Sequence, residues 1–107
     1  MTYYKAMSEA VNTQLINNIS IILKKSLAAD ATLFDLRAKG QAKFSQIFKQ
    51  ETSFDCVADT FQPYVQEVAD DLLEWQKNND KQILVRLVKK IDLLLKVLQQ
   101  FELSHSI

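Results

Sequence analysis

Residues Gln82–Leu103 read QILVRLVKKIDLLLKVLQQFEL, and this stretch decides the fold. Apolar residues recur in it at alternating steps of three and four: Leu84, Leu87, Ile91, Leu94, Leu98 and Phe101. This spacing keeps one face of an α-helix turned toward its neighbours. Val88 and Leu95 widen the apolar stripe, and no Gly or Pro interrupts it. The stretch therefore predicts a long amphipathic helix against which the rest of the chain packs.

The composition predicts a single globular domain over residues 1–107. Apolar residues make up 48% of the chain and charged residues 24%, a balance typical of a folded protein rather than a disordered one. One Gly and one Pro in the whole chain are too few for a turn-rich β protein. The formal net charge is zero, so nothing global favours nucleic acid or an anionic membrane as a partner.

The sequence also predicts where the protein resides. Cys56 is the only cysteine, which excludes an internal disulfide and fits a reducing compartment. The opening residues MTYYKAMSEAVN lack the basic-then-apolar pattern of a signal peptide. The longest apolar runs are far shorter than the roughly 20 residues that a membrane span requires. We therefore expect a soluble cytoplasmic protein that does not enter membranes.

Two helices are predicted in the first half of the chain. Residues Tyr3–Leu27 form the first, which carries an apolar stripe at Val11, Leu15, Ile19 and Ile22. A break is expected at Ala28–Ala31, with Asp30 as the N-cap of a second helix over about 31–49. Gly40 lies on the apolar side of that second helix. It either allows a neighbouring helix to approach closely or marks a kink, and we favour close approach.

A third helix is predicted from Phe54 to Trp75. Its stripe runs in regular steps through Phe54, Val57, Phe61, Tyr64, Val68, Leu72 and Trp75. Pro63 lies inside this run, so the helix either bends there or divides, with Pro63 in the first turn of the second piece. The unbroken stripe favours one bent helix. A turn at Lys77–Asp80 follows, in which Asn79 or Asp80 caps the fourth helix.

These four helices are joined by loops of about four residues. Connections this short place consecutive helices side by side in opposite directions. The predicted fold is therefore all-α, an antiparallel four-helix bundle, and we expect a monomer or a weak dimer.

The chain offers little for catalysis. Its only histidine is His105, in the predicted C-terminal tail, whereas metal-carboxylate bundles need Glu-x-x-His pairs on facing helices. There is no glycine-rich phosphate loop and no zinc-ligand spacing. We interpret Cys56 as a small buried hydrophobic residue rather than a nucleophile. The sequence predicts a protein that is not an enzyme and that has no metal and no cofactor.

Charge is segregated between the last two predicted helices. From Glu51 to Glu74 all charged residues are acidic, whereas the fourth helix is mainly basic. One explanation is that the two helices are neighbours and their facing edges attract each other.

A second explanation is a docking site. On a helical wheel the basic residues share one arc opposite the main stripe, with two apolar residues among them. This predicted partner-binding set is Arg86, Lys89, Lys90, Leu93, Lys96 and Val97. Cations around an apolar pair are suited to an acidic-hydrophobic peptide or helix. Direct nucleic-acid binding would need basic residues interleaved with exposed aromatics, and most aromatics here lie on core stripes, so we expect it to be weak or absent.

Part of the second half resembles a known family. Phe54-Asp55-Cys56, Phe61, Tyr64-Val65-Gln66-Glu67 and Leu72 resemble a run of the primosomal replication protein PriC family, and Leu87, Ile91, Leu95 and Leu98 resemble that family's next helix. The resemblance covers about half the chain. It implies a bacterial replication-restart factor that works with single-stranded-DNA-binding protein and helps to load the replicative helicase. The alternative is an immunity protein, antitoxin or secretion chaperone that binds one protein partner.

Overall fold

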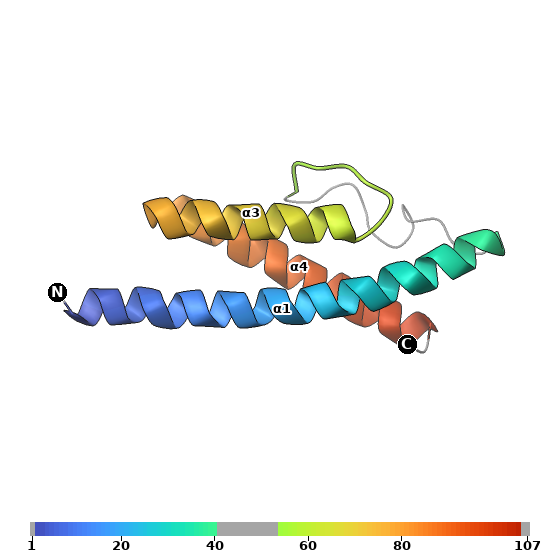
Figure 1. The fold of residues 1–107 in the computed structure, drawn as a ribbon, viewed down its shortest axis with the longest axis horizontal. Helices are drawn as coiled ribbons and strands as arrows, with labels where there is room; N and C mark the ends of the chain where they lie inside the picture. The colour runs from blue at the N-terminus through green and yellow to red at the C-terminus, as the bar shows by residue number, and fades with distance from the viewer. Residues whose placement is uncertain (1, 41–53, 106–107) are drawn as a thin grey trace.

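The protein is all-α. The computed structural model describes residues 2–40 and 54–105, in which there are three helices and no strand. Helix α1 spans Thr2–Ala38, α3 spans Gln62–Asn78 and α4 spans Lys81–His105. Helix α3 runs antiparallel to α1, and α4 runs back in the direction of α1, crossing behind both helices in this view (Figure 1). Each of the three helices contacts the other two.

The four-helix bundle predicted from the sequence is not found, because the described residues contain three helices. The predicted break at Ala28–Ala31 is wrong, since α1 continues through it to Ala38. Alanine is the best helix former, so the three alanines in this stretch extend the helix rather than end it. The rest of the predicted second helix, residues 41–49, lies outside the described residues.

One buried face of α1 crosses the expected break without interruption. Its members lie three, four or seven residues apart: Leu15, Ile22, Ser26, Ala29 and Leu33. Only Ser26 is polar, and its hydroxyl donates a hydrogen bond of 2.9 Å to the Leu23 carbonyl of its own helix. The same face therefore packs on α3 and α4 from Leu15 to Leu33, which makes one long helix more stable than two short ones.

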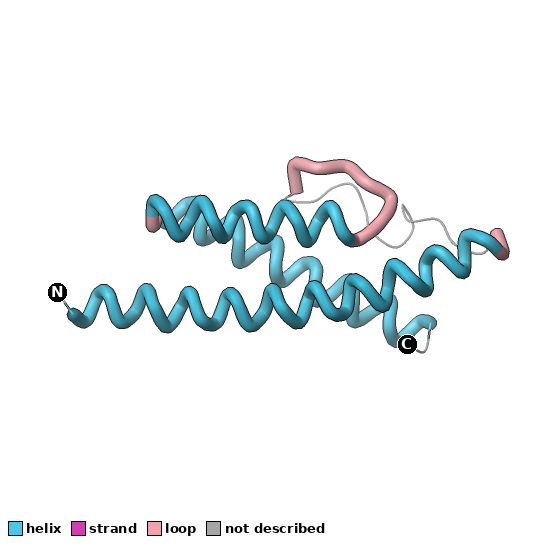
Figure 2. The backbone as a smooth tube through the Cα atoms, viewed as in Figure 1, coloured by secondary structure: helices cyan, strands magenta, loops and turns pink. Residues whose placement is uncertain are grey.

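The helix predicted from Phe54 begins at Gln62 instead, and Pro63 lies in its first turn. Proline is tolerated there because the first-turn amides have no partner inside the helix. Residues 54–61 form a loop that folds back along the start of α3 (Figure 2). The single bent helix that we favoured is therefore wrong, and the alternative with Pro63 in a first turn is correct for α3.

Both aromatic ends of this loop are buried although neither lies on a helix. The Phe54 ring packs edge-on against Tyr64, with 5.1 Å between ring centroids, and Phe61 packs against Phe101 at 5.8 Å. Val57, between them, is 79% exposed. The regular spacing of Phe54 and Phe61 thus reflects two separate anchors of a loop rather than one helical face.

Asp30 does cap a helix, but a different one from that predicted. Its carboxylate oxygens accept the backbone N–H groups of Phe61 at 2.7 Å and Gln62 at 3.1 Å. These amides open α3, whose N-cap residue supplies no side-chain hydrogen bond of its own. An aspartate inside α1 therefore satisfies the start of α3. It also gives the loop and α3 a fixed position along α1.

Helix α4 is the element that the sequence predicts best. The Asp80 carboxylate accepts the Gln82 N–H at 2.8 Å, which confirms Asp80 as its N-cap. Asn79 adopts the left-handed conformation that ends α3, and its N–H donates to the Trp75 carbonyl. The core face of α4 consists of Ile83, Leu87, Ile91, Leu94, Leu98 and Phe101.

Gly40 does not permit a close helix contact. Its φ of +67° places it in the left-handed region just after α1, and an added Cβ would meet no atom of the described residues within 4 Å. Its N–H donates to the Arg37 carbonyl at 3.0 Å. Gly40 therefore terminates α1, the common role of glycine after a helix.

Ile91 tests the core face of α4. Ile91 is 5% exposed, and Ile91→Ala should lower the free energy of unfolding by about 2–5 kcal/mol. Val88→Ala is the control, because Val88 lies on the same helix but is half exposed; it should cost no more than about 0.5 kcal/mol. Urea denaturation followed by circular dichroism measures both. Equal losses would show that Ile91 is not packed as described.

Candidate functional site

The predicted partner-binding residues all lie on α4, but the structure divides them. Arg86, Lys89 and Lys96 are exposed, whereas Leu93 and Val97 are half-buried and pack against the core. Lys90 is only 1% exposed, so its expected position on the surface is wrong. The remaining five residues, Arg86, Lys89, Leu93, Lys96 and Val97, are called the docking surface below.

Lys90 reaches inward to α3. Its Nζ donates to Asp71 Oδ2 at 2.6 Å and lies 2.9 Å from Glu67 Oε2. Both carboxylates are largely buried, with 12% and 14% of their side chains exposed. Opposite charges at the facing edges of α3 and α4 therefore attract each other, which was the first explanation for the charge segregation. It accounts for Glu67, Asp71 and Lys90.

Glu67 also holds the loop that precedes α3. Its carboxylate accepts the backbone N–H of Cys56 at 2.7 Å and that of Asp55 at 3.0 Å. The Lys90 Nζ lies 5.7 Å from the centroid of the Phe54 ring, within the range of a cation–π contact. One buried charge cluster, formed by Lys90, Glu67 and Asp71, thus joins α3, α4 and the loop.

The pKa values of the cluster follow from these contacts. Burial raises the pKa of Glu67, but hydrogen bonds from Lys90 and the two loop amides outweigh it, so the pKa falls below the usual 4.5. Burial lowers the pKa of Lys90, and its bonds to Asp71 and Glu67 outweigh that effect, so the pKa rises above 10.5. Both groups are therefore charged at neutral pH.

The same cluster makes Cys56 a poor nucleophile. Burial and the neighbouring Glu67 carboxylate raise the pKa of the Cys56 thiol to about 11. A thiol reacts as its thiolate, which is then scarce at neutral pH. The half-buried Cys56 contacts the core, in line with its interpretation as a small hydrophobic residue. His105, expected in a solvated tail, instead lies in the last turn of α4, 4.5 Å from the Phe101 ring.

The exposed charges next to the cluster are not neutralised within the part of the chain that the structure describes. Arg86 and Lys89 form no ion pair there, and neither do Asp70 and Glu74 on α3. Among the described residues Lys96 pairs only with Asp92 on its own helix, at 2.8 Å, and both side chains are mostly exposed. Arg86 and Lys89 are therefore the exposed cations of the docking surface that have no ion-pair partner among the described residues.

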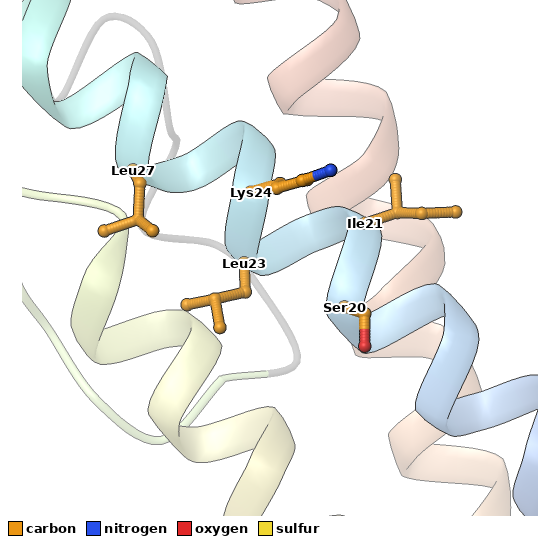
Figure 3. Close-up of a pocket in the computed structure, with 5 residues that line it drawn as sticks. All are labelled: Ser20, Ile21, Leu23, Lys24 and Leu27. Carbon is orange, nitrogen blue, oxygen red and sulfur yellow. The ribbon is translucent and has the colours of Figure 1, made fainter.

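Sequence analysis missed an exposed apolar stripe on α1. Its members lie seven, four and seven residues apart: Ile16, Leu23, Leu27 and Phe34. Phe34 is 78% exposed. Leu23 and Leu27 line a shallow hollow together with Ser20, and they point to one side of the helix while Ile21 points away (Figure 3). The signal was present in the sequence as a second stripe beside the first, but the expected break at Ala28–Ala31 divided it.

Residues 2–40 and 54–105 contain neither a metal-binding cluster nor a membrane-spanning helix. No group of three His, Cys, Asp or Glu side chains gathers there in a way that could hold a metal ion. None of the described helices combines the length and apolarity needed to cross a bilayer. Comparison with known protein families, curated proteins and solved structures finds no match.

Lys90 should be essential for the fold. Removing its cation leaves two carboxylates, Glu67 and Asp71, buried beside each other, with only the loop amides donating to Glu67. Lys90→Ala should therefore lower the free energy of unfolding by about 3–5 kcal/mol. Lys89→Ala is the matched control. Lys89 is the exposed neighbour of Lys90, and its replacement should lower the free energy of unfolding by no more than about 0.5 kcal/mol. Chemical denaturation of both variants measures the difference, and a small loss for Lys90→Ala would contradict the buried cluster.

The cluster should also make stability depend on pH. The pKa of Glu67 is lower in the folded protein than its ordinary value of 4.5. The Glu67 carboxylate therefore contributes fully to the free energy of unfolding above pH 4.5, and this contribution is lost as the pH falls through the folded pKa. Glu67→Gln should lower the free energy of unfolding by about 1–3 kcal/mol at pH about 7. The difference from wild type should become smaller below pH 4.5. Urea denaturation across this range measures it, with exposed Glu74→Gln as control. A difference that stays constant down to pH about 3 would contradict the assignment.

Proposed function

We propose that this protein is a non-catalytic protein–protein interaction module whose docking surface receives an acidic segment with an apolar anchor. The observation that carries the proposal is the pair of exposed cations, Arg86 and Lys89, without an ion-pair partner among the described residues. The half-buried Leu93 and Val97 lie on the same side of α4 as these cations, because Leu93 follows Lys89 by four residues and Val97 follows Leu93 by four. They supply an apolar contact between cations.

The cations and the apolar residues of the docking surface have different roles in binding. Exposed cations raise the rate of encounter with an acidic partner and fix its register, and salt screens them. The apolar pair adds contact that salt does not screen. Lys90 is no part of this surface in the proposal, because its charge is used within the fold.

The resemblance to the PriC family suggests which partner to test first. It points to a bacterial replication-restart accessory protein of the primosome that contacts single-stranded-DNA-binding protein or the replicative helicase. The acidic, apolar C-terminal tail of single-stranded-DNA-binding protein has the chemistry that the docking surface requires. In this proposal the chain acts in the cytoplasm as a monomer or weak dimer, without a cofactor and with little direct contact to DNA.

A second function is favoured by the acidic side of α3. Asp70 and Glu74 are exposed and form no ion pair among the described residues. An acidic patch of this kind suits an immunity protein that masks a basic nuclease, or an antitoxin or secretion chaperone. This alternative uses α3 rather than α4, so the two functions predict different sensitive residues.

Charge reversal on α4 tests the first function. Isothermal titration calorimetry with the tail peptide should detect binding to wild type. Arg86→Glu/Lys89→Glu should weaken it about tenfold or more, equivalent to about 1.4 kcal/mol. The control is Lys24→Glu/Lys39→Glu, which makes the same change of net charge at two exposed positions, one on α1 and one just after its end, and should bind as wild type does. Equal affinities for all three proteins, or no binding to wild type, would remove the docking surface and favour the α3 alternative.

A further inference from the structure

The buried cluster marks the seam between α3 and α4, and a line of charges continues along each side of it. On α3, Glu67 and Asp71 lie in the seam, and Asp70 and Glu74 follow at helical steps of three and seven from Glu67. On α4, Arg86 precedes Lys90 by one turn, and Lys89 directly precedes Lys90 in the sequence. The exposed residues Asp70, Glu74, Arg86 and Lys89 form what is called the rim below.

The two sides of the rim lie level with each other. Helices α3 and α4 run in opposite directions, and Lys90 contacts both Glu67 and Asp71. With the same rise per residue in both helices, Glu74 comes level with Arg86, and Asp70 with Lys89. Each acidic residue of the rim therefore has a basic residue at the same height on the other helix.

We propose that this face binds a second copy of the chain, with α3 of each copy on α4 of the other. A two-fold axis parallel to the helices leaves the height of each residue along the helices unchanged. It places α3 of one copy over α4 of the other. It therefore places Glu74 of one copy over Arg86 of its partner, and Asp70 over Lys89. A two-fold axis across the helices would place acidic α3 on acidic α3, which repels. Charge complementarity thus selects one symmetric dimer, in which the contact is self-complementary.

The size of the face makes this dimer weak. Helix α3 has 17 residues and is about 25 Å long, and two adjacent helices are about 20 Å wide. The loop before α3 already covers the part of this face at Glu67, so the footprint is at most about 500 Å² on each copy, below the roughly 800 Å² of a stable interface. Opposed charges at a small, largely polar contact should give reversible association that salt weakens.

Sedimentation velocity tests the dimer without any peptide, so its outcome is independent of the proposed function. Wild type should associate at salt of about 0.1 M and weaken at least tenfold at about 1 M, where the screening length falls from about 10 Å to about 3 Å. Asp70→Lys/Glu74→Lys should be monomeric, and so should Arg86→Glu/Lys89→Glu, because each makes both contacts of the symmetric dimer repulsive.

Mixing these two variants is the decisive step. In the mixed pair both contacts again join opposite charges, so an equimolar mixture should form a heterodimer although neither variant associates alone. The control mixes Asp70→Lys/Glu74→Lys with Lys24→Glu/Lys39→Glu. Two reversals move the net charge from 0 to −4 in both acidic variants. The control keeps the wild-type rim, so it should self-associate as wild type does and leave the lysine variant monomeric in the mixture.

Three outcomes would overturn the proposal. The first is a wild-type protein that stays monomeric at millimolar concentration and low salt. The second is a dimer that survives both reversals, which would place the contact elsewhere, such as on the exposed apolar stripe of α1. The third is association that continues beyond a dimer, which would exclude the two-fold arrangement. Circular dichroism of every variant establishes that loss of association is not loss of fold.

Discussion

The contact of Lys90 with Asp71 and Glu67 is the interaction on which the rest of the structure depends. A cation that is 1% exposed must meet its carboxylates at short range, because an unpaired buried charge is far more costly than a lost apolar contact. Apolar residues tolerate a shift of one helix along another, whereas this cluster does not. It therefore fixes the height of α3 on α4, and through Glu67 it also fixes the loop that leads into α3.

Burial of Lys90 also decides which charges remain outside. On α3, Glu67 and Asp71 point inward, whereas Asp70 and Glu74 are exposed to solvent. On α4, Lys90 points inward, whereas Arg86 and Lys89 are exposed. The segregation of charge seen in the sequence thus has two physical consequences. Inside, it joins two helices, and outside, it leaves an acidic edge beside a basic one. The join between the helices is seen in the contacts of Lys90 with Glu67 and Asp71. The exposed acidic and basic edges are the basis of both proposals for binding.

What the sequence could predict depended on whether a feature is local. The stripe of α4 and its Asp80 cap lie within one segment, and the cap and the stripe from Leu87 to Phe101 were predicted correctly. At the start of the stripe Ile83 is buried in place of Leu84, and Val88, expected to widen it, is half exposed. Asp30 and Lys90 could not be placed, because each is satisfied by groups from a distant part of the chain, which the periodicity of a single helix does not contain. The alanines at 28–31 did carry a local signal for helix, but Asp30 among them was interpreted as the N-cap of a new helix. The five residues of the docking surface stay a prediction.

The two proposed uses of the rim are linked, because a second copy and an acidic peptide would cover the same cations, Arg86 and Lys89. Ligands that exclude each other weaken each other by mass action, so the peptide would favour the monomer and self-association would lower the apparent affinity for the peptide. The coupling can be only as strong as the weaker of the two contacts. A weak dimer therefore leaves the surface accessible at low concentration and covers it only where the protein is locally abundant, which a large apolar interface would not allow.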